Sequence, residues 1–147
     1  MFKYRLEPVL GLKEKLEENK KRELGLAHQY YEEVKKEQHQ LVKEKERAYE
    51  EARNQINEKV DVNQLKQLNH YAHYIEKAIK LKTKELDLAA KEVEQKREEL
   101  IEAVKERKIL GNLKEIHLEE YKEEEKRIQN SIVDEIVSYK YSAGQKE

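Results

Sequence analysis

The chain has 147 residues, of which 43% are charged and 37% hydrophobic, a balance too polar for a globular core but sufficient to line a narrow seam between helices. Its 31 basic and 32 acidic residues nearly cancel and are interspersed, so no basic field attracts nucleic acid, and we expect no nucleic-acid partner. The lack of cysteine excludes disulfides and thiol chemistry, and no apolar run approaches the roughly 18 residues of a membrane span, so we expect a cytoplasmic protein without direct membrane insertion.

The first predicted element is a helix over about residues 5–57. Ala, Glu, Lys, Leu and Arg make up 85 of the 147 residues, a share typical of long helices, and the single proline, Pro8, fits a first helical turn. Steps of three and four residues from Leu24 find apolar side chains at seven of nine positions, the pattern of a heptad seam. These positions are Leu24, Ala27, Tyr31, Val34, Gln38, Leu41, Lys45, Ala48 and Ala52. The expected continuation toward the N-terminus is Phe2, Leu6, Val9 and Leu16.

A break in this pattern at residues 57–65, NEKVDVNQL, separates the first helix from a second one. Asp61 followed by Gln64 fits a capping box, so we expect a turn over about 58–61 and a helix over about 62–141. The second helix has its own seam, apolar at eight of nine positions: Leu65, Leu68, Ala72, Ile75, Ile79, Lys82, Leu86, Ala89 and Val93. In helical proteins a connection as short as this turn joins two neighbouring helices that run antiparallel. The sequence therefore predicts an all-α fold, a single domain over residues 1–147 in which two long helices form an antiparallel coiled-coil hairpin, with a flexible tail at 142–147.

The two predicted helices are unequal in length. Folding the chain at residue 59 or 60 sets Leu6 opposite about residue 113, so the last ~28 residues of the second helix, about 40 Å, overhang without an intramolecular partner. Ile128, Ile132, Ile136 and Tyr139 recur there at helical spacing and form an apolar stripe. A binding partner is one way to cover this stripe, and pairing of two such ends in a homodimer, or a frayed tail, are the alternatives.

The sequence offers little for catalysis or metal binding. His70, His73 and Glu76 share one helical face and are the one arrangement that resembles metal ligands, but a continuous surface helix has no cleft that excludes water. A glycine-rich phosphate loop, a nucleophile elbow and an HExxH motif are all absent. We therefore expect a protein that is not an enzyme and has no catalytic residue, metal or cofactor, with a metal-binding helical protein as the alternative.

Three segments of the sequence, taken together, form a set of motifs that occur in a fixed order. FKYRLEPVLGLKEKLEE at the N-terminus, YAHYIEKAI after the predicted turn, and SIVDEIVSYKY near the C-terminus, centred on Asp134 and Glu135, occur in this order. Together they resemble the flagellar FliJ proteins, components of the type III protein export apparatus that builds the bacterial flagellum. The resemblance extends over nearly the whole chain.

The resemblance implies a fold and a set of partners. The family fold is an antiparallel two-helix coiled coil, similar to the stalk-forming part of the rotary ATP synthase γ subunit, which agrees with the hairpin. The implied partners are the hexameric flagellar export ATPase, the membrane export gate protein and substrate-export chaperones, at the inner face of the cell membrane. The implied ATPase-binding residues are Phe2, Leu6, Ile132, Asp134, Glu135, Ile136 and Tyr139. The residues implied to face the gate or a chaperone are Tyr71, Tyr74, Ile75 and Ala78.

Some of these residues have a second interpretation. Ile75 lies on the predicted seam and is also a core candidate, whereas Tyr71 and Tyr74 lie off the seam. Asp134 and Glu135 also fit solvated surface charges. For the whole chain, the alternatives to a flagellar coupling stalk are the equivalent stalk of a virulence type III secretion system and a generic coiled-coil scaffold or dimerisation protein.

Overall fold

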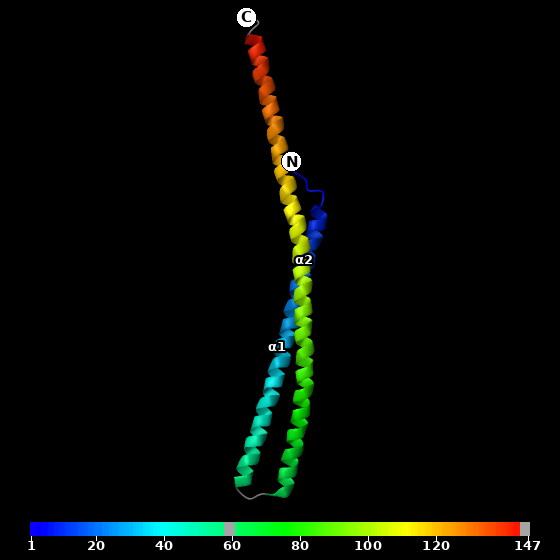
Figure 1. Cartoon of the computed structure of the whole chain (residues 1–147), viewed down its shortest axis with the longest axis vertical. Helices are drawn as coiled ribbons and strands as arrows, with labels where there is room; N and C mark the ends of the chain where they lie inside the picture. The colour runs from blue at the N-terminus through cyan, green and yellow to red at the C-terminus, as the bar shows by residue number, and fades with distance from the viewer. Residues whose placement is uncertain (58–60, 145–147) are drawn as a thin grey trace. The chain divides into compact units, whose positions relative to one another are not determined.

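The computed structural model describes residues 1–57 and 61–144, which form two α-helices and, within these ranges, no strand. Helix α1 is Glu7–Asn57 and helix α2 is Val62–Gly144 (Figure 1). The helices pack against each other in opposite directions, so the predicted all-α helical hairpin is confirmed. Over the residues described, neither helix has a stretch long and apolar enough to cross a membrane.

The helix ends follow from local hydrogen bonding. Helix α1 begins at Glu7, two residues later than expected, where the Glu7 amide donates to the Tyr4 carbonyl at 3.1 Å. Pro8 has no amide hydrogen and therefore suits this first turn. Asp61 is the N-cap of α2, because its side-chain Oδ1 accepts a hydrogen bond from the Asn63 amide at 3.1 Å. Helix α2 ends at Gly144, three residues past the expected end. Residues 58–60 of the predicted turn and 145–147 of the predicted tail lie outside the described residues.

The packed helices divide into two compact units. The central unit is residues 19–101, and the terminal unit is residues 1–18 with residues 102–147. In the central unit all eighteen predicted seam positions are buried or half-buried, so the predicted seam is confirmed there. Ile75 is its most buried side chain, 1% exposed, and the polar seam residue Gln38 is satisfied because its Nε2 donates to Thr83 Oγ1 at 2.9 Å.

The terminal unit is held at its N-terminal end by aromatic contacts. The Tyr4 hydroxyl donates to the Leu110 carbonyl at 3.0 Å, and the Tyr4 ring lies edge-on to His117 with centroids 5.7 Å apart. The Phe2 ring packs against Tyr121 at a centroid distance of 5.6 Å. Tyr4 and Leu10 are buried, so these few contacts form the core of the unit at this end.

The predicted continuation of the seam in the terminal unit is partly wrong. Val9 and Leu16 lie on the outside, 40% and 37% exposed, whereas Leu10 and Glu17 are buried. Glu17 and Leu10 lie seven and fourteen residues before the seam residue Leu24, so the seam keeps its heptad spacing here. Glu17 pairs with the Arg107 guanidinium, and Lys13 pairs with Glu106 at 2.8 Å. A paired charge can therefore occupy a seam position that a search for apolar residues alone passes over.

Candidate partner-binding surfaces

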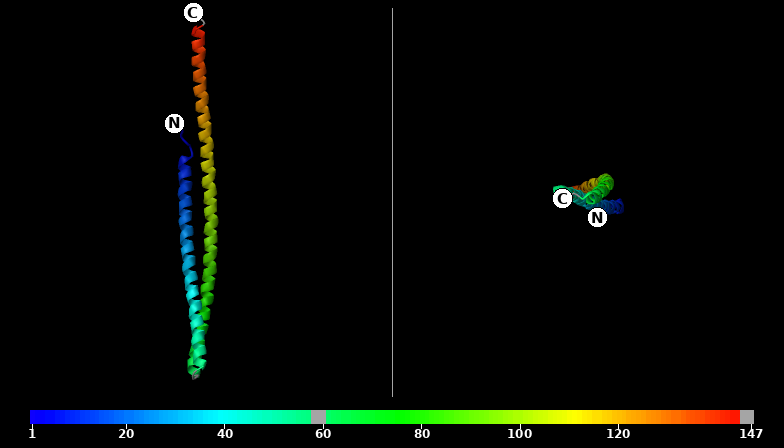
Figure 2. Two further views of the ribbon diagram at one scale, coloured as in Figure 1. Left: turned by 90° about the vertical axis from the view of Figure 1, so that its left-hand side faces the viewer. Right: turned by 90° about the horizontal axis from the view of Figure 1, so that it is seen from below.

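The C-terminal part of α2 has no helix packed against it. From Lys122 to Gly144 every residue is exposed, and this segment is called the overhang below. Both side views show the red end of α2 extending beyond the N-terminus with nothing beside it (Figures 1 and 2). The large apolar side chains exposed on the overhang are Ile128, Ile132, Val133, Ile136, Val137, Tyr139 and Tyr141. Seven large apolar side chains exposed on one unpaired helix are typical of a binding interface.

Four of the exposed apolar side chains of the overhang lie on one face, whereas Val133, Val137 and Tyr141 lie about 100–180° around the helix from Ile132. At about 100° of rotation per residue, Ile128, Ile132, Ile136 and Tyr139 fall within an arc of about 80°. Asp134 lies about 160° from Ile132, on the other side of the helix. There it lines a shallow polar hollow together with Arg127, Asn130, Ser131, Glu135 and Ser138. A single partner can contact Ile132 and Asp134 together only if it reaches around the helix.

The two N-terminal residues of the predicted ATPase-binding set lie differently. Phe2 and Leu6 are half-buried in the terminal unit, and Phe2 packs on Tyr121 at the point where the overhang begins. These side chains therefore have a packing role of their own. Part of each remains accessible to a partner at the base of the overhang.

The predicted gate-facing or chaperone-facing set separates into core and surface. Ile75 is 1% exposed and belongs to the core of the central unit, and Ala78 is half-buried. Tyr74 is 70% exposed and Tyr71 is 47% exposed. The two tyrosines are therefore the members of this set that a partner can reach directly.

The histidines near the start of α2 do not converge with Glu76 as metal ligands do. His73 Nδ1 lies 3.7 Å from Glu76 Oε2, but the same carboxylate accepts a hydrogen bond from the Tyr49 hydroxyl at 2.9 Å and pairs with Lys45 at 3.4 Å. The hydrogen bond from Tyr49 and the charge of Lys45 hold the pKa of Glu76 below its ordinary value. Glu76 thus joins α1 to α2. Within residues 1–57 and 61–144 no group of three or more His, Cys, Asp or Glu residues is placed to hold a metal ion.

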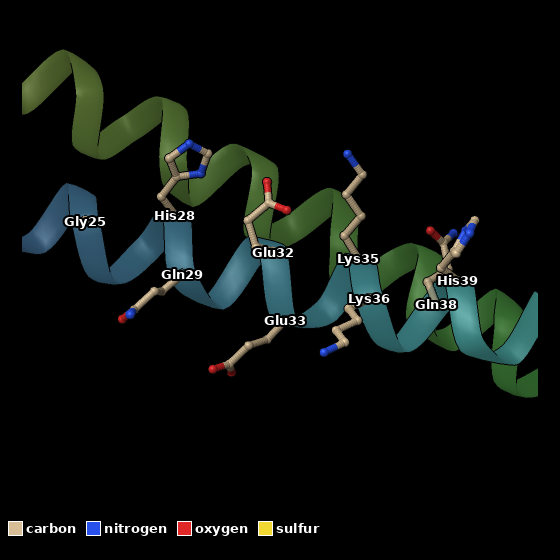
Figure 3. Close-up of a pocket in the computed structure, with 9 residues that line it drawn as sticks. All are labelled: Gly25, His28, Gln29, Glu32, Glu33, Lys35, Lys36, Gln38 and His39. Carbon is tan, nitrogen blue, oxygen red and sulfur yellow. The ribbon is translucent and has the colours of Figure 1, made fainter.

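A shallow hollow runs along α1 in the central unit (Figure 3). Its lining residues all come from α1 and are Gly25, His28, Gln29, Glu32, Glu33, Lys35, Lys36, Gln38 and His39. In the close-up, His28, Glu32 and Lys35 point to one side of the helix, while Glu33 and Lys36 point to the other. These side chains share no point at which a substrate could react, and none belongs to the predicted binding sets.

One surface feature was missed from the sequence. Leu81 and Leu88 are 67% and 66% exposed on α2, and together with Tyr74 they recur at intervals of seven residues. A search for a second heptad pattern beside the seam could have found them.

These features define a class of protein. Two long helices packed as a hairpin, with exposed apolar side chains and an unpaired helical end, define an all-α coiled-coil protein. The chain belongs to the FliJ family, because the family model described as "Flagellar FliJ protein" matches residues 2–146. The resemblance inferred from the sequence is therefore confirmed, and membership of this family supports a role in type III protein export.

The fold also has a match among solved structures. A protein from Chlamydia trachomatis described as a YscO homolog aligns over 100% of this chain and 99% of its own, with a TM-score of 0.53 and 22% identity. At this identity the match supports the helical-hairpin fold alone. No curated protein matches the chain.

Proposed function

We propose that this chain is a non-enzymatic stalk or coupling protein. In this proposal it binds the hexameric flagellar export ATPase, promotes the assembly or activity of the hexamer, and links it to the membrane export gate and to substrate-export chaperones. It works in the cytoplasm, at the inner face of the cell membrane at the flagellar base, without a cofactor. The observation that carries the proposal is the overhang, an unpaired helix over residues 122–144 whose residues are all exposed and include seven large apolar side chains.

The apolar face of the overhang can supply a substantial part of the binding energy. Full burial of an isoleucine side chain stabilises by about 1.5–3 kcal/mol. Ile132 and Ile136 are each 50% exposed, so a partner that covers both gains about 1.5–3 kcal/mol from the pair. This corresponds to a tenfold to hundredfold change in Kd, to order of magnitude.

The positions of the polar residues favour a partner that encloses the overhang. Asp134 and Ile132 face nearly opposite directions, and Glu135 lies between these faces. A flat surface covers only one of them, whereas the hole of a hexameric ring covers both. Phe2 and Leu6 add contacts at the base of the overhang, where Phe2 already lies on Tyr121.

The second proposed contact lies on the central unit. Tyr71 and Tyr74 are exposed there, and we assign the export gate or a chaperone to this surface. Ala78 is half-buried and forms part of the edge of the same surface. Ile75 is almost fully buried, so its part in this proposal is to stabilise the core of the central unit.

The ATPase contact is tested with a matched pair of double variants. Ile132→Asp with Ile136→Asp places two charges on the apolar face of the overhang, and Ile109→Asp with Ile116→Asp is the control. Ile109 and Ile116 are 67% and 52% exposed in the paired part of the terminal unit, so residue type, exposure and added charge are matched. Each variant is measured for helicity, melting temperature and binding to the cognate export ATPase.

We expect the overhang variant to keep its helicity and melting temperature but to bind the ATPase at least tenfold more weakly. The control is expected to bind as the unmodified chain does. If the overhang variant instead melts earlier, or if light scattering shows that it has lost a dimeric state, the apolar face is a self-association surface and the proposed ATPase contact is wrong.

A further inference from the structure

A second apolar row runs along α2 in the central unit. Tyr74, Leu81 and Leu88 are 70%, 67% and 66% exposed and lie seven residues apart. Each precedes a seam residue (Ile75, Lys82 and Ala89) by one position, so the row is rotated by about 100° from the seam. Scattered exposed leucines are ordinary, but a heptad row beside a filled seam has the spacing that packs against another helix.

A row of lysines follows the apolar row. Lys77, Lys84 and Lys91 each come three residues after a member of the apolar row, and residues three apart are neighbours on a helix surface. All three lysines are exposed, and in the described part of the chain none of them has an ion-pair partner. This edge of the apolar row is therefore positively charged, with exposed Asp87 on the far side of the lysines.

The opposite edge of the apolar row is already neutralised. Glu85, between Leu81 and Leu88, accepts a hydrogen bond from the Tyr30 hydroxyl at 2.6 Å and pairs with Lys82 at 3.1 Å. Lys82 also pairs with Glu37 of α1. Glu92, on the same edge, pairs with Lys96 at 3.9 Å. The acidic side chains on this edge are thus paired within the central unit, and the charges that border the apolar row without an ion pair among the described residues are those of the lysines, with exposed Asp87 farther around the helix.

We propose that the row of Tyr74, Leu81 and Leu88, with Lys77, Lys84 and Lys91 at its edge, docks an acidic amphipathic helix of a partner protein. The row spans 14 residues, about 21 Å at 1.5 Å per residue, so it matches a partner helix of about four turns. Apolar side chains of the partner pack on the row, and its carboxylates pair with the lysines.

Charge argues against antiparallel pairing of two copies of this chain along the row. Antiparallel pairing of two copies along the row sets the lysines of one copy against those of the other, and like charges across a helical interface are destabilising. The inference rests on the proposed function in one respect, because Tyr74 also belongs to the proposed gate or chaperone contact. Leu81, Leu88 and the lysines lie outside that set.

The probes are two synthetic amphipathic helical peptides of equal length, with leucines in a heptad pattern and either glutamate or lysine on both flanks. Binding to the full chain is measured by fluorescence anisotropy at low and high salt. The variants are Leu81→Glu with Leu88→Glu, a charge reversal of Lys77, Lys84 and Lys91 to Glu, and Ile109→Glu with Ile116→Glu as the control. Circular dichroism verifies that each variant is helical.

We expect the unmodified chain to bind the glutamate peptide in preference to the lysine peptide, and added salt to weaken binding. The leucine variant is expected to bind at least tenfold more weakly, the charge reversal to invert the preference, and the control to bind normally. The inference is overturned by no preference between the peptides, by a normal leucine variant, by preferential binding to phosphatidylglycerol vesicles, or by dimerisation through the row.

The same variants separate this inference from the proposed function. Gate or chaperone binding that needs Tyr71 and Tyr74 but survives the leucine variant, with no glutamate-peptide binding, overturns the docking row and leaves the proposed contact in place. Glutamate-peptide binding that needs Leu81 and Leu88, without any binding of gate or chaperone, supports the docking row and contradicts the proposed contact.

Discussion

Two neighbouring residues in the proposed gate surface should respond to truncation in opposite ways. Ile75 is 1% exposed and Tyr74 is 70% exposed, although both belong to the segment that resembles a binding site. We expect Ile75→Ala to destabilise the hairpin and Tyr74→Ala to leave its stability almost unchanged. The comparison shows whether loss of binding in this segment reflects a lost contact or a damaged core.

The expected size of each effect follows from burial. Isoleucine has three more carbon groups than alanine, and burial of each stabilises by about 0.8 kcal/mol, which gives about 2.4 kcal/mol in total. A residual cavity raises the cost of Ile75→Ala to about 3 kcal/mol, which lowers Tm by about 6–12 °C in a chain of this size. Tyr74 is mostly solvated, and its truncation should change the free energy of unfolding by about 0.5 kcal/mol or less.

The assay is urea and thermal unfolding followed by circular dichroism at 222 nm, alongside binding of the purified gate protein. The expected result is that Tyr74→Ala weakens gate binding at unchanged Tm, whereas Ile75→Ala lowers Tm. Equal destabilisation by the two substitutions would refute the assignment of Ile75 to the core and Tyr74 to the surface.

Three further predictions concern the paired helices. The hydrogen bond from Tyr30 and the charge of Lys82 hold the pKa of Glu85 below its ordinary 4.5. The contribution of ionised Glu85 to the free energy of unfolding is therefore complete above pH 4.5 and is lost as pH falls through the folded pKa. Urea unfolding at pH 7 and pH 3 should therefore show that acidification lowers the free energy of unfolding less for Tyr30→Phe than for the unmodified chain. Gly25→Ala should stabilise by about 0.5–1 kcal/mol in urea unfolding, because the added Cβ meets nothing within 4 Å; a destabilised variant would contradict the open space seen there. Glu17→Ala should cost about 1–2 kcal/mol, whereas Glu17→Leu with Arg107→Leu should be no less stable than the unmodified chain, which a double-mutant cycle by thermal unfolding measures.

Much of the fold could be predicted because it depends on a single repeating pattern. Both central seams are read from steps of three and four residues, and Asp61 marks the start of α2 by residue type alone. The exposed apolar face of the overhang follows from helix lengths, since α1 is 51 residues long and α2 is 83.

The rest of the fold depends on contacts between the two helices, which the residue pattern of one helix does not predict. Glu17 is buried at a seam position, where it pairs with Arg107, and this pairing depends on the register of both helices. An apolar search therefore selected Leu16, which the structure places outside. The separation of Tyr74 from Ile75 could be predicted from the seam, but that the lysines beside Leu81 and Leu88 form no ion pair with the residues described is known from the structure and not from the sequence.

The central claim is that the overhang acts on the export ATPase. The most direct measurement is the ATPase activity and hexamer content of the cognate export ATPase with the full chain and with a chain truncated after Lys126. Truncation there should leave the packed helices intact, because every residue from Lys122 to Gly144 is exposed. The account predicts stimulation or hexamer assembly by the full chain and its loss in the truncated one. Equal stimulation by both chains, or none by either, would contradict it.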